Sequence, residues 1–344
     1  MLATRKLPQF RVALNSRCGR ACFYCRPSGE SLPLTAGESI APDSLLKIAT
    51  VVRRYGIGSI KLTGGDPALY GQLEEVVYRL RAEAGFEEIE LISRNPLIGA
   101  RAEKLAQTGV TQFNISLDTL KADVHRQICG VDDLPKLLSA LSACVRTKIP
   151  CKVNTVVLAG VNDGELDELV EFCGEVGVVT LKFLDLISDL HQGGETFSHR
   201  AVRKEKRPVQ DMYMSLEGIR SRLENAAVRT EIVRQGDLGH PMPTLTMPSG
   251  LRVIFKDSSY GAWYGTVCNG CRLFPCHDAL MALRLTADLR LQFCLLNETT
   301  ALPLKELVNG RQSALEAAVA EALAVYTNAH FVQAASSPRP IVRQ

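Results

Sequence analysis

The stretch Cys18-Gly-Arg-Ala-Cys22-Phe-Tyr-Cys25 is the part of the sequence on which the interpretation of the whole chain rests. Three cysteines in the spacing C-x3-C-x2-C can bind three corners of a cube-shaped 4Fe–4S cluster and leave the fourth iron without a protein ligand. A cluster that only carries electrons takes four thiolates, whereas an open iron can coordinate a second cofactor or a substrate. A structural zinc site and three unrelated core cysteines are the alternatives, and the density of the spacing favours the cluster.

Composition and charge narrow the class of protein. The chain has 344 residues, of which 46% are hydrophobic, so it can bury a large core and is expected to form one large domain with a smaller part attached. A net charge of +3 gives no basic excess that would indicate a nucleic acid partner. Residues 1–10 lack an apolar signal core, and no apolar run is long enough to span a bilayer. We therefore expect a cytoplasmic protein with no membrane partner, whose cysteines stay reduced and favour metal over disulfide bonds.

A second group of cysteines lies in the C-terminal third of the chain. Its members are Cys268, Cys271, Cys276 and Cys294. Four thiolates can saturate an auxiliary 4Fe–4S cluster, which would then serve electron transfer or shape the pocket. The alternatives are a four-cysteine zinc site and a site in which His277 replaces one cysteine. The remaining cysteines have apolar neighbours and are expected in the core; they are Cys129, Cys144, Cys151 and Cys173.

Strand-like and helix-like segments alternate from residue 9 to residue 184. The expected strands are residues 9–15, 59–62, 89–93, 112–115, 151–158 and 180–184. The expected helices between them are residues 72–84, 100–107, 134–145 and 163–176. This alternation predicts right-handed βαβ units and a parallel sheet. We expect an α/β fold, an incomplete parallel (β/α)6 barrel, with its sites at the C-terminal ends of the strands.

The pattern changes after the sixth strand. Residues 188–210 are polar and basic, which predicts a solvated loop, with a lid over an anionic substrate as the alternative. A helix is expected over residues 212–225, and two hairpins, over residues 244–255 and 283–295, predict a β-rich module. We therefore divide the chain into a partial barrel over residues 1–235, an auxiliary module over residues 236–300, and a C-terminal helix and tail over residues 301–344.

A glycine pair follows the second predicted strand, in Thr63-Gly64-Gly65-Asp66-Pro67. Paired glycines remove side chains where a ligand must approach the backbone. Together with the cysteine spacing, this motif resembles the Gly-Gly-Glu-Pro motif of the radical SAM enzymes, with aspartate in place of glutamate. The resemblance implies that S-adenosylmethionine chelates the open iron, and that the reduced cluster cleaves it to a 5′-deoxyadenosyl radical. Tyr24 matches the aromatic position that this superfamily uses against the adenine.

A more specific resemblance covers most of residues 9–190 and also residues 283–296. Phe113-Asn-Ile-Ser116-Leu-Asp118, Val153-Asn154 and Leu283-Arg-Leu-Thr-Ala-Asp288 resemble the GTP cyclase family that starts molybdenum-cofactor biosynthesis. The resemblance, with Tyr24, implies cofactor contacts from Gly64, Gly65, Asp66, Ser93, Asn95, Ser116 and Ile187. It places the family's nucleotide-binding cations at Arg11, Lys61, Lys152, Lys182 and Arg284. Lysine replaces arginine at positions 61 and 182, which keeps the charge but loses the planar fork.

The chain departs from this family where the substrate would bind. Ala282 replaces an arginine, and Ile92-Ser93-Arg94-Asn95 replaces Thr-Thr-Asn-Gly. The family's C-terminal Gly-Gly is not found at Val342-Arg343-Gln344. Leu280 takes the place of an auxiliary-cluster cysteine, so the predicted auxiliary module, of the twitch or SPASM type, would use a different cysteine set.

These observations predict a radical SAM enzyme, of lyase or oxidoreductase type. Its expected cofactors are a SAM-binding 4Fe–4S cluster, an auxiliary 4Fe–4S cluster and S-adenosylmethionine. We expect a phosphorylated, nucleotide-like small molecule as the substrate, which the enzyme cyclises or rearranges, and an external electron donor such as flavodoxin or ferredoxin. The alternatives are a divergent GTP cyclase, a peptide-modifying radical SAM enzyme and a non-catalytic iron–sulfur or zinc protein.

Overall fold

One twelve-stranded sheet organises the fold. The computed structural model describes residues 7–25, 39–187, 209–234, 239, 241–258, 262–263, 282–294, 301–327 and 332–333. In sheet order the strands are β13 (Leu302–Pro303), β12 (Arg290–Gln292), β11 (Ala282–Leu285), β1 (Gln9–Ala13), β2 (Ser59–Thr63), β3 (Glu88–Ser93), β4 (Gln112–Ser116), β5 (Cys151–Val156), β6 (Thr180–Leu184), β9 (Arg252–Lys256), β8 (Met242–Thr246) and β7 (Arg229–Val233). Neighbouring strands from β1 to β6 are all parallel, which confirms the predicted α/β barrel core.

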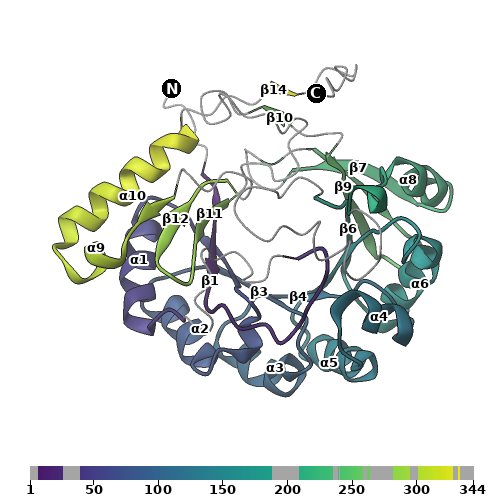
Figure 1. The fold of residues 1–344 in the computed structure, drawn as a ribbon, viewed down its shortest axis with the longest axis horizontal. Helices are drawn as coiled ribbons and strands as arrows, with labels where there is room; N and C mark the ends of the chain where they lie inside the picture. The colour runs from purple at the N-terminus through teal and green to yellow at the C-terminus, as the bar shows by residue number, and fades with distance from the viewer. Residues whose placement is uncertain are drawn as a thin grey trace.

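Helices cover the outer face of the curved sheet, and Figure 1 shows them in an arc around the strands. They are α1 (Pro42–Arg54), α2 (Leu73–Ala82), α3 (Leu97–Thr108), α4 (Ala122–Cys129), α5 (Leu134–Arg146) and α6 (Leu166–Val176). The two-residue alternation of each strand explains this arrangement. In β5 and β6, Val153 and Leu181 belong to the main hydrophobic core, whereas their neighbours Lys152 and Lys182 line an inner cavity. The sequence thus places apolar side chains under the helices and polar ones inside the barrel.

Two helices of the barrel, α1 and α4, were not among the predicted elements. For α1 the sequence does carry a signal, because Pro42 and Asp43 stand in its first turn and Leu45, Ile48 and Val52 are buried on one face. The short helix α4 ends at Gly130, which has the left-handed φ of +80° that a helix C-terminus favours.

The two predicted hairpins extend the barrel sheet at opposite edges. Strand β9 pairs in parallel with β6, with Lys182 opposite Ile254, and β8 pairs with β9 in antiparallel fashion. Strand β11 pairs in parallel with β1, with Arg11 opposite Arg284, and β12 follows it in antiparallel fashion. The parallel part of the sheet therefore runs from β11 to β9. The domain boundaries at residues 235 and 300 stay predictions.

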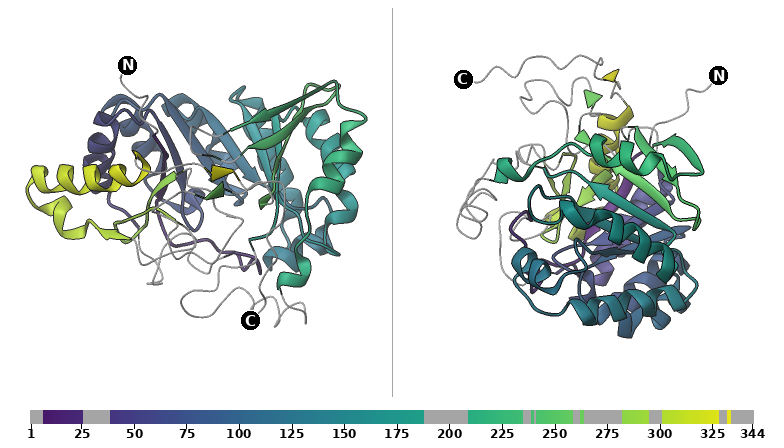
Figure 2. Two further views of the ribbon diagram at one scale, coloured as in Figure 1. Left: turned by 90° about the horizontal axis from the view of Figure 1, so that it is seen from above. Right: turned by 90° about the vertical axis from the view of Figure 1, so that its right-hand side faces the viewer.

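The predicted C-terminal helix is present as α9 (Lys305–Asn309) and α10 (Gln312–Thr327). Helix α10 lies beside α1, where Arg54 Nη1 pairs with Glu316 Oε1 at 2.7 Å. Its Tyr326 hydroxyl donates to the carbonyl oxygen of Ala282 at 2.8 Å, which ties the helix to β11. Figure 2 shows α9 and α10 at one end of the molecule and α8 with β7 at the other.

Smaller elements complete the described structure. They are α8 (Glu217–Glu224), the 3-10 turns η1 (Pro67–Leu69), η2 (Asp163–Glu165) and η3 (Val209–Met212), and a two-stranded sheet of β10 (Ala262–Trp263) and β14 (Val332–Gln333). Most of the predicted loop at residues 188–210 lies outside the described residues. None of the helices that the structure describes is long and apolar enough to cross a membrane.

Candidate active site

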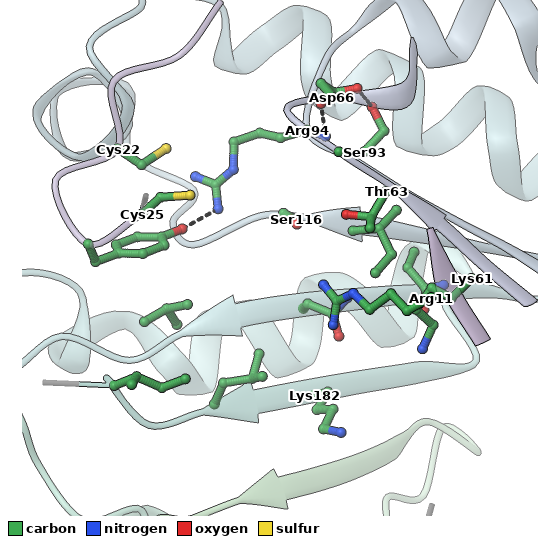
Figure 3. A pocket seen from close by; sticks show the side chains of 18 of the residues that line it. Arg11, Cys22, Cys25, Lys61, Thr63, Asp66, Ser93, Arg94, Ser116 and Lys182 are labelled. Carbon is green, nitrogen blue, oxygen red and sulfur yellow. Dashed lines mark hydrogen bonds between the residues drawn. The ribbon is translucent and has the colours of Figure 1, made fainter. Parts of the chain in front are cut away.

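A cavity of about 380 Å³ lies inside the barrel, at the C-terminal ends of the parallel strands. Its wall contains the cysteine loop, which we define as residues 16–25, and a group of basic side chains on the inner face of the sheet. Figure 3 shows Cys22 and Cys25 on one side of this cavity, and Arg11, Lys61 and Lys182 farther along it. Ser93 and Ser116 end their strands and the glycine pair follows β2, as predicted. The five predicted basic residues differ, because they lie within their strands, and Lys152 is only the second residue of β5.

The cavity brings together nearly all of the predicted site residues that the structure describes. Those that line it are Cys18, Cys22, Tyr24, Cys25, Gly64, Gly65, Asp66, Ser93, Ser116 and Ile187, with Arg11, Lys61, Lys152, Lys182 and Arg284. Asn95 and Cys294 are not part of this wall. The other predicted auxiliary ligands, Cys268, Cys271 and Cys276, lie outside the described residues.

The backbone of the cysteine loop is fixed against helix α4. The amide of Ala21 donates to the carbonyl oxygen of Cys129 at 2.9 Å, and the amide of Phe23 donates to that of Ile128 at 3.3 Å. The side chain of Phe23 is fully buried in a small second core that also contains Ile128 and Leu158. The loop is therefore held in place by backbone and side chain before any metal binds.

The glycine pair lets the cysteine loop approach strand β2. The amide of Gly65 donates to the carbonyl oxygen of Asn15 at 2.6 Å, and that of Asp66 donates to the carbonyl oxygen of Arg17 at 2.6 Å. A Cβ atom added at Gly65 would lie 2.2 Å from the Arg17 oxygen, and one at Gly64 would lie 2.6 Å from the Asn15 oxygen. We predicted that glycines are needed here so that a ligand can approach the backbone. The structure shows a second reason for glycine, which is the close contact between the backbones of the cysteine loop and the segment after β2.

The carboxylate of Asp66 is held by the C-terminal end of β3 and by the turn that follows Asp66. It accepts hydrogen bonds from Ser93 Oγ at 2.7 Å and from the amides of Ala68, Arg94 and Asn95 at 2.8 to 3.0 Å. Asn95 does not line the cavity, and its Oδ1 accepts from the amide of Leu97 at 3.0 Å. Asp66 thus fixes the loop after β3. Because its carboxylate is occupied by these bonds, we expect backbone groups at this part of the wall to contact the cofactor.

The three cysteines fit an iron–sulfur cluster better than a single metal ion. Within the part of the chain that the structure describes, no group of three or more His, Cys, Asp or Glu side chains could hold one metal ion. In a cluster the thiolates can lie farther apart than around a single ion, because each thiolate binds a different iron at a different corner of the cube. Burial, helped by Asp66 and Cys22, raises the pKa of the Cys18 thiol to about 11 in the metal-free protein. Cluster assembly would therefore release protons from these thiols.

A buried polar triad joins the cysteine loop to the barrel rim. The Tyr24 hydroxyl donates to Asp118 Oδ2 at 2.6 Å, Arg94 Nη2 donates to the Tyr24 hydroxyl at 2.5 Å, and Arg94 pairs with Asp118 at 2.6 Å. Arg94 and Asp118 were not among the predicted site residues. A signal was present for Asp118, since it lies two residues after Ser116, the last residue of β4.

Six basic side chains form what we call the cation group. They are Arg11, Lys61, Lys152, Lys182, Lys256 and Arg284, all of which line the cavity. Lys256, at the end of β9, was not predicted, because nothing in the sequence showed that β9 pairs with β6. Within this group, Lys61 pairs with the carboxylate of Glu90 at 2.8 Å.

Crowding and burial act on the lysines of the cation group. Burial is the main cause that lowers the pKa of Lys152 to about 8, and neighbouring Lys61 lowers it further. Burial also lowers the pKa of Lys182 well below its usual value, with help from Lys152 and Lys256. Neither ammonium group makes a hydrogen bond or ion pair with a residue that the structure describes. An anionic ligand would relieve the repulsion and supply the missing partners.

Comparison with protein families gives a match over the barrel. A family described as the Radical SAM superfamily matches residues 12–173, which run from β1 into α6 and include the cysteine loop.

Similar curated proteins carry one activity in their names. A probable GTP 3′,8-cyclase of Archaeoglobus fulgidus is 37% identical over 169 residues, which are 49% of this chain and 55% of that protein. The chain thus spans about half of that relative. A probable GTP 3′,8-cyclase of Pyrococcus horikoshii is 27% identical over 85% of this chain and 84% of its own length. A GTP 3′,8-cyclase of Clostridium perfringens is 26% identical over 64% of this chain and 72% of its own length.

A solved structure shares the fold. Streptococcus suis SuiB bound to S-adenosylmethionine matches with a TM-score of 0.60 and 13% sequence identity, over 89% of this chain and 65% of SuiB. At this identity the match supports the architecture alone.

Proposed function

We propose that this chain, which matches the Radical SAM superfamily over residues 12–173 and resembles the GTP 3′,8-cyclases, generates a 5′-deoxyadenosyl radical and uses it on a phosphorylated, nucleotide-like small molecule. The cofactors of this class are a 4Fe–4S cluster and S-adenosylmethionine. The observation that carries the proposal is one cavity that contains both the cysteine loop and the cation group. A radical formed beside the cysteines would need to travel only across this cavity to reach an anion held by the cations.

Each part of the wall has its own role in this proposal. Cys18, Cys22 and Cys25 hold three irons, and the backbone around Gly65 faces the cofactor. When bound, the cluster and S-adenosylmethionine supply the electron and the radical. Apolar side chains beside the cysteine loop, Leu186 and Ile187 among them, line the same cavity and would keep water away from the radical.

The cation group determines the substrate class in this proposal. Lys152 and Lys182 point into the cavity from neighbouring parallel strands, with Asn154 opposite Lys182 in register. Phosphate oxygens accept strong, charge-assisted hydrogen bonds from such groups. Lys61 is already paired with Glu90, so we propose that it contributes positive charge to the site and that the other cations contact the phosphate directly.

A divergent GTP cyclase is the second candidate, and the names of the similar proteins favour it. Two features of this cavity oppose it. Ala282, which replaces an arginine of that family's pattern, is part of the cavity wall, and so is the bulky cation Arg94 in the replaced segment after β3. We therefore propose a related but altered substrate. A one-electron donor of low potential, such as flavodoxin or ferredoxin, would reduce the cluster.

The auxiliary cluster belongs to the same proposal. Cys294 follows β12, and its carbonyl oxygen accepts from Gln292 Nε2 at 2.8 Å, which fixes its backbone next to β11 and Arg284. We propose Cys294 as one ligand of a second 4Fe–4S cluster, together with Cys268, Cys271 and Cys276. Replacing Cys294 with alanine should lower the iron content without removing the SAM-binding cluster.

The test uses anaerobic, cluster-reconstituted protein with S-adenosylmethionine and a chemical reductant. Formation of 5′-deoxyadenosine is followed by mass spectrometry in the presence of GTP or guanosine, and of ATP or adenosine. We expect the phosphorylated member of at least one pair to stimulate 5′-deoxyadenosine formation, and Lys152→Met to abolish that advantage. Conversion of GTP to an isomer would favour the second candidate. An equal response to nucleotides and nucleosides would contradict the proposed substrate class.

A further inference from the structure

Arg94 is a buried cation on the cluster side of the cavity that the proposed reaction does not yet use. Its residue exposure is 8%, and its side chain lines the cavity at the C-terminal end of β3. The guanidinium carbon lies 5.8 Å from the centre of the Tyr24 ring, and Nη2 makes the bonds to Tyr24 and Asp118. Its Nε and Nη1 make no hydrogen bond within the described residues. Two nitrogens, with three N–H groups, thus remain for whatever occupies the cavity.

Asp118 prevents Arg94 from moving away. This carboxylate is 1% exposed, and its Oδ1 accepts from the amide of Val156 at 3.0 Å while Oδ2 binds Tyr24 and Arg94. The triad therefore links β3, β5, the segment after β4 and the cysteine loop. The amide of Arg94 is held as well, by Asp66 at 2.8 Å. The backbone amide and the guanidinium of Arg94 are thus each held by a carboxylate, Asp66 and Asp118, that lies outside the loop with the thiols.

The positive charge lies within electrostatic reach of the thiols. Figure 3 shows the guanidinium on the same side of the cavity as the sulfur atoms of Cys22 and Cys25. Burial raises the pKa of both Cys18 and Cys22, and Arg94 acts against this rise at each of them. A cation that stabilises thiolates from this position also stabilises the extra negative charge of a reduced cluster bound to them.

We propose that Arg94 is a positioning residue that sets the reduction potential of the cluster held by Cys18, Cys22 and Cys25. Reduction adds one electron to the cluster from a low-potential donor, which is oxidised, and the fixed cation makes the reduced form less costly. Net charge near an iron–sulfur cluster is one of the factors that determine its potential. Asp118 works in the opposite direction, because its carboxylate offsets part of the Arg94 charge. The inference rests on the proposed function, since it requires the cluster.

The resemblance to GTP cyclases does not account for this cation. The segment after β3 of that family reads Thr-Thr-Asn-Gly, so an uncharged asparagine stands where this chain has Arg94. The role therefore comes from the charge and contacts of Arg94 in this chain, and the resemblance does not supply it.

The experiment is an EPR-monitored redox titration of the reconstituted cluster without S-adenosylmethionine, with iron content measured in parallel. We expect Arg94→Gln to shift the potential to more negative values, Arg94→Lys to stay close to wild type, and Asp118→Asn to shift it to less negative values. The control is Arg220→Gln, because Arg220 is a partly buried arginine of α8 that pairs with Glu217 and Glu224 of its own helix and does not line the cavity. This control should leave the potential unchanged.

Shifts of opposite sign distinguish an electrostatic role from simple damage to the fold, which would change both variants in one direction or lower their iron content. An unchanged potential in Arg94→Gln at wild-type iron content would overturn the inference while leaving the proposed function intact. If Arg94→Gln holds no cluster, Asp118→Asn decides, and an unchanged potential there overturns the inference. A wild-type protein that binds no cluster would overturn both.

Discussion

At the scale of single residues, Gly65 is the position where the cysteine loop and the barrel come closest. The distance of 2.2 Å between an added Cβ and the Arg17 oxygen leaves no room for any other residue, since the obstacle is backbone. The glycine pair could be predicted from the sequence, but only the structure shows that its partner is the backbone of the cysteine loop.

Gly65→Ala should therefore displace the cysteine loop. We expect a loss of stability of about 1–3 kcal/mol, typical of an overpacked site, and a lower iron content after reconstitution. Gly71→Ala is the matched control, because an added Cβ there meets nothing within 4 Å. Thermal unfolding and iron analysis of both variants measure the effect. Normal iron loading in Gly65→Ala would contradict this account of the loop.

Lys152 makes anion binding sensitive to pH. Its pKa is about 8 in the free protein, and a bound phosphate would raise it by favouring the charged form. Binding therefore takes up a proton above pH 8. The part of the affinity that Lys152 contributes should be constant below that pH and fall by up to about tenfold per pH unit as the pH rises through it.

Isothermal titration calorimetry with inorganic triphosphate checks this prediction. Buffers of different ionisation enthalpy will report the proton uptake directly. Lys152→Met should reduce this uptake at pH 8.5, while Lys136→Met, a change on the outer helix α5, should leave it at the wild-type value. Binding that involves no proton at pH 8.5 in the wild-type protein would contradict the prediction.

At the scale of elements, helix α4 supports the cysteine loop. Phe23 of that loop is fully buried against Ile128 of α4, and two backbone hydrogen bonds join the two segments. This helix was not among the predicted elements, so the cysteine spacing could be predicted but the element that shapes the loop could not.

Phe23→Ala should cost about 3–5 kcal/mol of stability, the usual range for a buried phenylalanine, and should also lower the iron bound per folded protein. Phe86→Ala is the matched control. Phe86 is equally buried but packs on Phe10 near the start of β3, at the opposite end of the barrel from the cysteines. The control should be destabilised to a similar extent and still load iron. Equal iron loss in both variants would show that α4 has no special role.

At the scale of the whole molecule, the features that depend on local sequence patterns could be predicted, and those that depend on long-range strand pairing could not. The six strands of the barrel core follow from alternating strand and helix patterns, which are local. The parallel pairing of β1 with β11, which sets Arg11 beside Arg284, joins residues at opposite ends of the chain. No local pattern specifies which sheet edge a hairpin joins, so the continuation of the barrel sheet and the position of Lys256 could not be predicted.

The same distinction holds for the site. The cysteine spacing and the glycine pair are contiguous motifs, and the structure places their described residues in one cavity. The triad of Tyr24, Arg94 and Asp118 is built from three separate segments, so its members carry no mutual signal in the sequence. The cation group combines both cases, because five members follow from the family resemblance and one from the sheet topology.

The assignment of the cysteine loop as the radical-generating site is tested by a comparison of wild-type protein with Cys22→Ala after anaerobic reconstitution. Both are incubated with S-adenosylmethionine and reductant, and 5′-deoxyadenosine is quantified together with the iron content and the EPR signal of the reduced cluster. We expect the wild type to form 5′-deoxyadenosine and Cys22→Ala to form none above background, because its SAM-binding cluster should be missing. Equal 5′-deoxyadenosine formation by a variant that lacks this cluster would contradict the assignment of the cysteine loop as the radical-generating site.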